Sequence, residues 1–163
     1  MKTIWFCGKD EKILTSIAEC VGEELISRDC NVEVIVKSEI EDILGNGHIQ
    51  NKEEFSAFAD RLGFIGKLLN RNNIFALVVF CDIPLEDRKI VKENHKHYIQ
   101  INLGDKDQQT DIVLDKNLDP KQNAKIIVDY LVNLKLIQER SQSVYSKEEE
   151  EEIRKRLEDL GYV

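Results

Sequence analysis

The stretch from Ile74 to Cys81 is apolar at every position, and it constrains the fold more than any other part of the 163-residue chain. Strands in the middle of a parallel sheet are covered on both faces, so they carry continuous apolar runs instead of an alternating pattern. The run therefore predicts a central strand of a parallel sheet. Because parallel strands are joined by crossover connections, we expect helices to pack against that sheet.

Shorter apolar runs and amphipathic segments alternate along the rest of the chain. Further strands are expected over residues 4–7, 32–36, 98–103 and 112–114. Helices are expected from Leu14 onwards, over residues 40–44, 52–70 and 85–94, and from a cap at Asp119 through Leu134. This alternation predicts an α/β fold with a doubly wound parallel sheet flanked by helices.

The chain divides into a domain and a tail. We expect a domain at residues 1–137, a polar linker at 138–145 and an acidic amphipathic helix at 146–163. Ser146 and Glu149 form a capping-box pattern at the start of that helix. Its narrow apolar edge consists of Ile153, Leu157 and Leu160. Two interpretations stay open: the helix docks on a partner, or it packs loosely on its own domain.

Charge and composition exclude several classes of function. A net charge of -8 does not suit a nucleic-acid-binding protein, which needs a concentrated basic face. The sequence has no apolar run of the roughly 18 residues that a membrane span requires, so we expect a cytoplasmic protein without membrane contact. The cysteines are scattered, and His95 and His97 have no third ligand nearby, so we expect no metal site and place His95 in an exposed loop.

Several segments together resemble the adenylylsulfate kinase family. Residues 3–8, Thr-Ile-Trp-Phe-Cys-Gly, are similar to the family's first strand, Thr-Ile-Trp-Phe-Thr-Gly, which leads into the phosphate loop Gly-Leu-Ser-Gly-x-Gly-Lys-Thr-Thr. Residues 61–72, Arg-Leu-Gly-Phe-Ile-Gly-Lys-Leu-Leu-Asn-Arg-Asn, resemble its stretch Arg-x-Gly-Phe-x-x-Lys-Leu-Leu-x-Arg-Asn. Residues 32–35, Val-Glu-Val-Ile, look like the family's second strand. The resemblance covers roughly residues 2–103 and, more loosely, the helix from Pro120, and it implies a P-loop kinase-like fold.

The phosphate loop departs from the family pattern in this chain and reads as a degenerate Walker A motif. Such a loop needs glycines, because its N–H groups approach the phosphates closely, and a lysine that neutralises the transferred group. Leu14 stands at the aligned lysine position, and Glu11 and Ile13 replace the inner glycines. The residues that still fit the pattern are Gly8, Thr15 and Ser16. The family's Arg- and Lys-rich lid is also missing, because only residues 104–111 join the last two strands.

The resemblance and its gaps leave two main hypotheses. The first is a catalytically inactive pseudoenzyme that binds no cofactor and serves as a binding, scaffold or regulatory module linked to sulfate activation. Under this hypothesis the chain pairs with a protein partner or with further copies of itself. The second is an active kinase of adenylylsulfate or a related nucleotide that uses ATP and magnesium, with Lys12, Thr15 and Arg61 on the phosphates. The vestigial cofactor site would consist of Gly8, Lys12, Thr15 and Ser16, and Arg61 would be the remaining substrate-binding residue. A pocket for another small ligand is a third alternative.

Overall fold

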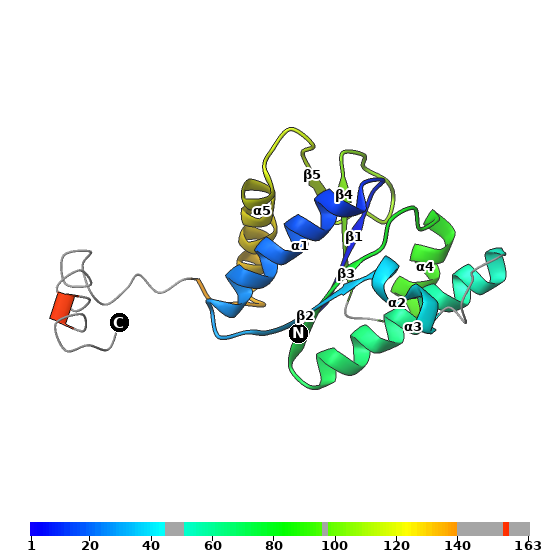
Figure 1. The fold of residues 1–163 in the computed structure, drawn as a ribbon, viewed down its shortest axis with the longest axis horizontal. Coiled ribbons are helices and arrows are strands. Elements are labelled where there is room, and N and C mark those ends of the chain that lie inside the picture. The colour runs from blue at the N-terminus through cyan, green and yellow to red at the C-terminus, as the bar shows by residue number, and fades with distance from the viewer. Residues whose placement is uncertain (45–50, 96–97, 140–154, 157–163) are drawn as a thin grey trace.

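A computed structural model describes residues 1–44, 51–95, 98–139 and 155–156. Within these residues all strands are parallel and form one sheet in the order β2-β3-β1-β4-β5 (Figure 1). The strands are β1 (Thr3–Cys7), β2 (Asn31–Val36), β3 (Ile74–Val79), β4 (Tyr98–Leu103) and β5 (Ile112–Leu114). The central strand predicted from the apolar run is β3, which lies between β2 and β1.

Helices cover both faces of the sheet. They are α1 (Glu11–Ile26), α2 (Lys37–Leu44), α3 (Lys52–Arg71), α4 (Leu85–Asn94) and α5 (Pro120–Asn133). Helices α1 and α5 pack side by side on one face, and α3 and α4 pack on the other (Figure 1). The predicted doubly wound α/β sheet is therefore confirmed.

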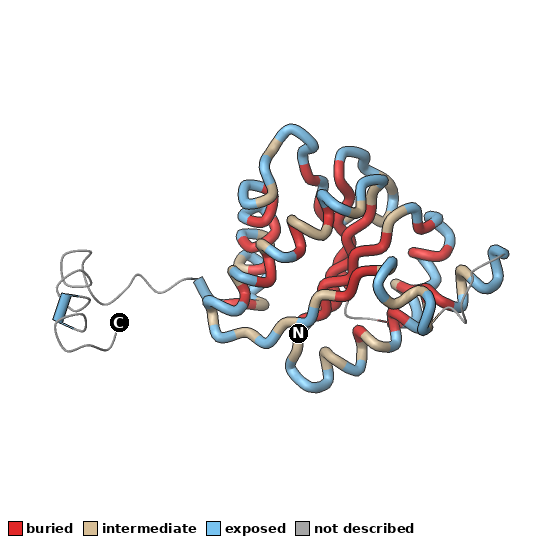
Figure 2. Tube along the Cα trace, in the orientation of Figure 1, coloured by how far each residue is buried: buried red, intermediate tan, exposed pale blue. Residues whose placement is uncertain are grey.

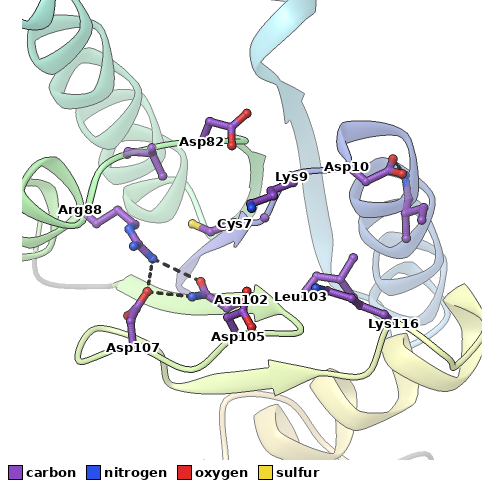
Figure 3. Close-up of a pocket in the computed structure, with 13 residues that line it drawn as sticks. Cys7, Lys9, Asp10, Asp82, Arg88, Asn102, Leu103, Asp105, Asp107 and Lys116 are labelled. Carbon is purple, nitrogen blue, oxygen red and sulfur yellow. Dashed lines mark hydrogen bonds and ion pairs between the residues drawn. The ribbon is translucent and has the colours of Figure 1, made fainter.

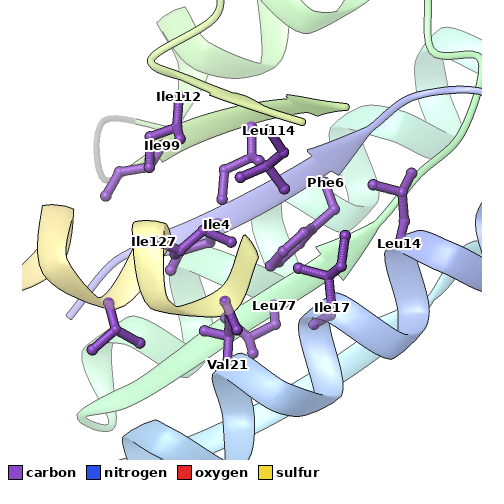
Figure 4. Close-up of a cluster of buried hydrophobic side chains, with 14 of the residues drawn as sticks. Ile4, Phe6, Leu14, Ile17, Val21, Leu77, Ile99, Ile112, Leu114 and Ile127 are labelled. Atoms are coloured by element: carbon purple, nitrogen blue, oxygen red, sulfur yellow. The ribbon is translucent and has the colours of Figure 1, made fainter. Parts of the chain in front are cut away.

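The core consists of two apolar clusters separated by the sheet, which Figure 2 shows as the most buried part of the chain. Strand β1 supplies both clusters, because successive side chains of a strand point to opposite faces. Ile4 and Phe6 join the cluster under α1 and α5, which Figure 4 shows, whereas Trp5 and Cys7 join the cluster under α3 and α4. Burying each large apolar side chain contributes about 1.5–3 kcal/mol.

The first helix begins at Glu11, three residues before the predicted start, because the side chain of Asp10 caps it there. The predicted linker at 138–145 and helix at 146–163 lie almost wholly outside the described residues and stay predictions. No helix in the described part of the chain is long and apolar enough to cross a membrane.

The expectation of an exposed loop at His95 is wrong. Its ring is buried at the end of α4, with a residue exposure of 9%, and its Nε2 lies 3.0 Å from Oδ1 of Asp60 on α3. Gly63 makes this burial possible, because a Cβ there would lie 2.3 Å from Cδ2 of His95. His97 lies outside the described residues.

A second close approach on α3 gives a testable prediction about stability. A Cβ on Gly66 would lie 2.6 Å from Oγ1 and 2.8 Å from Cγ2 of Thr3, a buried residue of β1 whose hydroxyl accepts a hydrogen bond from Asn70. We expect Gly66→Ala to lower the free energy of unfolding by about 1–2 kcal/mol, because overpacking outweighs the higher helix propensity of alanine.

Gly22 in α1 is the matched control for this substitution. A Cβ there would meet its nearest neighbours at 3.7 Å or more, which is ordinary van der Waals contact. Gly22→Ala is therefore expected to raise the free energy of unfolding by about 0.5–1 kcal/mol. Urea unfolding of both variants measures the difference, and equal effects of the two substitutions would contradict the packing of α3 against β1.

Candidate functional site

A cavity of about 370 Å³ lies at the carboxyl ends of β1, β3 and β4 (Figure 3). Ligands of open parallel α/β sheets bind at this edge, beside the strand where the order of connections reverses. Strand β1 occupies that position here, since β3 and β4 pair with it on either side. The charged residues that line the cavity are Lys9, Asp10, Asp82, Arg88, Asp105, Asp107 and Lys116.

The amino-terminal end of α1 lies beside this cavity, and its capping residue, Asp10, has a carboxylate side chain. The side chain of Asp10 accepts a hydrogen bond of 3.0 Å from the backbone N–H of Ile13. A helix N-terminus attracts anions because its first N–H groups have no partner within the helix. In this chain the Asp10 carboxylate already occupies part of that position, and its negative charge repels a further anion.

Leu14 lies in the hydrophobic core and not in the cavity. Its side chain is fully buried in the cluster between the sheet and α1 (Figure 4). It contacts the start of the loop closely, since a Cβ on Gly8 would lie 3.3 Å from Cδ1 of Leu14. The first turn of α1 is thus fixed by an apolar contact at this position.

The floor of the cavity is a network of polar side chains, in which Arg88 and Asn102 are buried and Asp107 is partly exposed. Arg88 from α4 forms an ion pair of 2.7 Å with Oδ2 of Asp107, and its side chain is only 10% exposed. Asn102 joins the two, because its Oδ1 accepts from Arg88 at 3.3 Å and its Nδ2 donates to Asp107 at 2.8 Å (Figure 3). The positive charge of Arg88 is therefore already paired with a carboxylate of the protein.

Asp107 also fixes the short loop between β4 and β5. Its carboxylate accepts hydrogen bonds from the backbone N–H of Gln109 and from the hydroxyl of Thr110. Burial would raise the pKa of Asp107, but these bonds, with those from Asn102 and Arg88, outweigh it and hold the pKa at about 2. The carboxylate stays charged at any ordinary pH.

This depressed pKa predicts a loss of stability in acid. A carboxyl group with a pKa of 3.8 in the unfolded chain and about 2 in the fold contributes about 2 kcal/mol, which is fully present above pH 5. We expect the free energy of unfolding of the native chain to exceed that of Asp107→Asn by about this amount at pH 7. The difference should disappear as the pH falls from about 5 to about 2. Urea titrations at several pH values measure it, and a constant difference would contradict the network.

Cys7 lines the same cavity but is not a nucleophile. Burial raises the pKa of its thiol to about 12, although Arg88 nearby lowers it. Since the thiolate is the reactive form, Cys7 is inert at neutral pH. In the described residues, no group of three or more His, Cys, Asp or Glu side chains can hold a metal ion.

The predicted site residues are not brought together. Gly8 lines the cavity, whereas Lys12 is exposed on α1 outside the cavity lining. Thr15 and Ser16 also lie on α1 away from the lining, and the hydroxyl of Thr15 donates to the carbonyl of Glu11 at 2.8 Å. Arg61 lies on α3, where its Nη1 donates to the carbonyl of Leu44.

The polar residues that build the cavity floor are not among those predicted from the sequence. Asn102 could have been predicted, because it lies near the carboxyl end of a predicted strand, where open α/β sheets bind their ligands. Asp82 likewise follows the predicted central strand. Arg88 and Asp107 carry no such signal, since their pairing depends on how α4 packs over the loop after β4.

Known proteins that this chain is similar to, in sequence or in fold, include adenylylsulfate kinases. An adenylyl-sulfate kinase of Picosynechococcus sp. is 26% identical over 99 residues, which cover 61% of this chain and 56% of the relative. This chain therefore matches little more than half the length of that relative. The hexameric APS kinase from Thiobacillus denitrificans superposes with a TM-score of 0.73 at 14% identity, covering 84% of this chain and 30% of that one.

A second solved structure matches over nearly its whole length. The Mycobacterium tuberculosis APS kinase in complex with AMPPNP and APS superposes with a TM-score of 0.71 at 15% identity, covering 80% of this chain and 96% of that one. At such low identities these likenesses establish the fold alone. The sequence model of the adenylylsulphate kinase family, in contrast, matches residues 1–122. Since this match includes most of the 163 residues, the chain belongs to the adenylylsulphate kinase family.

Proposed function

We propose that this chain is a catalytically inactive member of its family, a cytoplasmic pseudoenzyme that serves as a binding, scaffold or regulatory module linked to sulfate activation. The start of α1 is the observation that supports this proposal most directly. Asp10 caps the helix with its own carboxylate, and Leu14 is buried in the core at the position that the resemblance aligns with the family's lysine.

The residues of the cavity do not fit a nucleoside triphosphate with magnesium, the cofactor that the family implies. A polyphosphate needs a loop whose N–H groups converge on it and a net positive surrounding. Here the Arg88 cation is paired with Asp107, and further carboxylates from Asp10, Asp82 and Asp105 line the same cavity. Removing a single preorganised donor from a working enzyme already costs about 10²–10³ in rate. The loss of the lysine, the loop glycines and the lid together supports an inactive protein.

An active kinase with relocated groups is the alternative. Lys12, Thr15 and Arg61, which this hypothesis requires, do not line the cavity, but two other cations do. Lys9 and Lys116 line it and form no ion pair with the described residues, so they are the groups that favour this alternative.

Isothermal titration of the chain with ATP and magnesium distinguishes the two functions. The pseudoenzyme should give no saturable heat up to millimolar nucleotide, beyond the range in which kinases bind their substrates. Saturable binding in the micromolar range that is lost in the double variant Lys9→Ala, Lys116→Ala would overturn the proposal in its present form and favour the alternative, which a phosphoryl-transfer rate above background would then establish. A phosphoryl-transfer assay with adenylylsulfate as acceptor should likewise give only the background rate.

A further inference from the structure

An apolar strip runs along the solvent side of the carboxyl-terminal half of α3. Phe64 and Leu68 are 50% and 40% exposed and lie four residues apart, so they are neighbours on one face of the helix. The opposite face of α3 packs on the sheet through Phe58 and Leu62, which are fully buried. The exposed pair is therefore a separate surface and not the margin of the core.

Basic side chains surround this apolar pair. Residues 61–71 contain three basic residues and no acidic one, in a chain whose net charge is -8. Lys67 and Arg71 form no ion pair with the described residues. The α3 patch, as we name this surface, consists of Arg61, Phe64, Lys67, Leu68 and Arg71. It is the kind of surface that binds an acidic amphipathic helix.

The carboxyl-terminal segment of the same protein has the complementary character. Residues 148–152 are five consecutive glutamates, and residues 146–163 as a whole carry seven acidic and four basic side chains. Ile153, Leu157 and Leu160 follow the glutamates at helical spacings of four and three. Helices that dock in this way use apolar anchors at such spacings, with charged residues at the rim. This segment lies outside the described residues, apart from Lys155 and Arg156.

The place where the chain leaves the domain favours binding between two copies. Arg28, at the end of α1, donates to the carbonyl of Gln138 at 2.9 Å, which holds the exit of the chain in the layer of α1 and α5. The α3 patch belongs to the opposite layer (Figure 1). The linker at 138–145 would have to turn around the edge of the sheet to reach the patch of its own domain, whereas a second copy can present its patch directly.

We propose that residues 146–163 of one copy bind the α3 patch of a second copy, and that the exchange is reciprocal. Two equivalent contacts of this kind close a symmetric dimer. The glutamates face Lys67 and Arg71, and the apolar edge of the tail covers Phe64 and Leu68. This inference goes beyond the proposed function and does not depend on whether the cavity binds a nucleotide.

Light scattering of the full chain at defined concentrations tests the proposal. The native protein should have about twice the 18.9 kDa mass of one chain, and the dimer should weaken as the salt concentration rises. Two charge reversals, Lys67→Glu with Arg71→Glu in the patch and Glu150→Lys with Glu151→Lys in the tail, should each weaken dimerisation at least tenfold. The chain that combines both reversals should dimerise again, because the opposite charges are restored.

Matched variants exclude a loss of folding as the cause. Phe64→Ser with Leu68→Ser should also yield the monomer, whereas Ile126→Ser, an exposed apolar residue of α5, should leave the dimer intact. All variants should keep the native unfolding midpoint at low protein concentration. A monomeric native chain, a dimer that survives either charge reversal, or a failure of the combined reversal to restore the dimer would each overturn the proposal. Amide shifts in α3 caused by the tail reversal in a monomeric chain would also overturn it, since they would place the tail on its own domain.

Discussion

Replacing Leu14 by lysine is expected to destabilise the fold by about 3–5 kcal/mol and to create no ATP binding. The side chain is fully buried between α1 and the sheet, where it packs against the start of the loop at Gly8. A lysine there loses the apolar contacts and brings an ammonium group among the apolar side chains of the core. The substitution that would restore the family's motif in sequence is thus predicted to damage the structure.

Urea unfolding and isothermal titration with ATP and magnesium measure the two parts of this prediction. Leu14→Met is the control, because it conserves volume and polarity and should cost less than about 1.5 kcal/mol. If Leu14→Lys kept the native stability and bound ATP with micromolar affinity, residue 14 would face a phosphate site. The proposed inactivity would then rest on one side chain and not on the altered loop.

Most of the fold could be predicted because burial leaves a periodic pattern in the sequence. The continuous run at Ile74–Cys81 indicated the central strand, and the spacing of apolar residues in 52–70 indicated α3. The start of α1 was predicted three residues late. The resemblance aligned residues 8–16 with a loop, whereas the side chain of Asp10 caps a helix that begins at Glu11.

The site could be predicted far less well, since it depends on contacts between distant segments. Gly8 was located correctly at the cavity because it follows β1 directly. Arg88 and Asp107 are 19 positions apart, and neither residue type nor spacing indicates that they pair. His95 was misplaced for the same reason, because its burial depends on the missing side chain of Gly63 on another helix.

Together these contacts show how the family's fold is kept while its loop is changed. The sheet and the packing of α1 on it need an apolar side chain at Leu14, a cap at Asp10 and a fixed loop after β4. Each of these features stabilises the domain by itself. None of them involves a bound nucleotide, so a domain of this kind can stay folded without one.

Asp107→Ala is expected to lower the free energy of unfolding by about 3–5 kcal/mol. The substitution removes the ion-pair partner of Arg88, whose side chain is 10% exposed, and leaves a cation that is nearly desolvated. It also leaves the N–H of Gln109 and the hydroxyl of Thr110 without their acceptor, so the loop between β4 and β5 loses its anchor.

A double-mutant cycle separates the ion pair from the loop contacts. If the pair accounts for the effect, Arg88→Met with Asp107→Ala should be less destabilised than the sum of the two single variants, by about 1–3 kcal/mol. Asp105→Ala is the matched control, because this exposed residue of the same loop has no partner in the described residues and should change stability by less than about 0.5 kcal/mol. Strict additivity in the cycle would mean that Arg88 is stabilised by Asn102 and not by Asp107. The Arg88 cation would then be available to an anionic ligand in the cavity. The ion pair would no longer be an argument against polyphosphate binding.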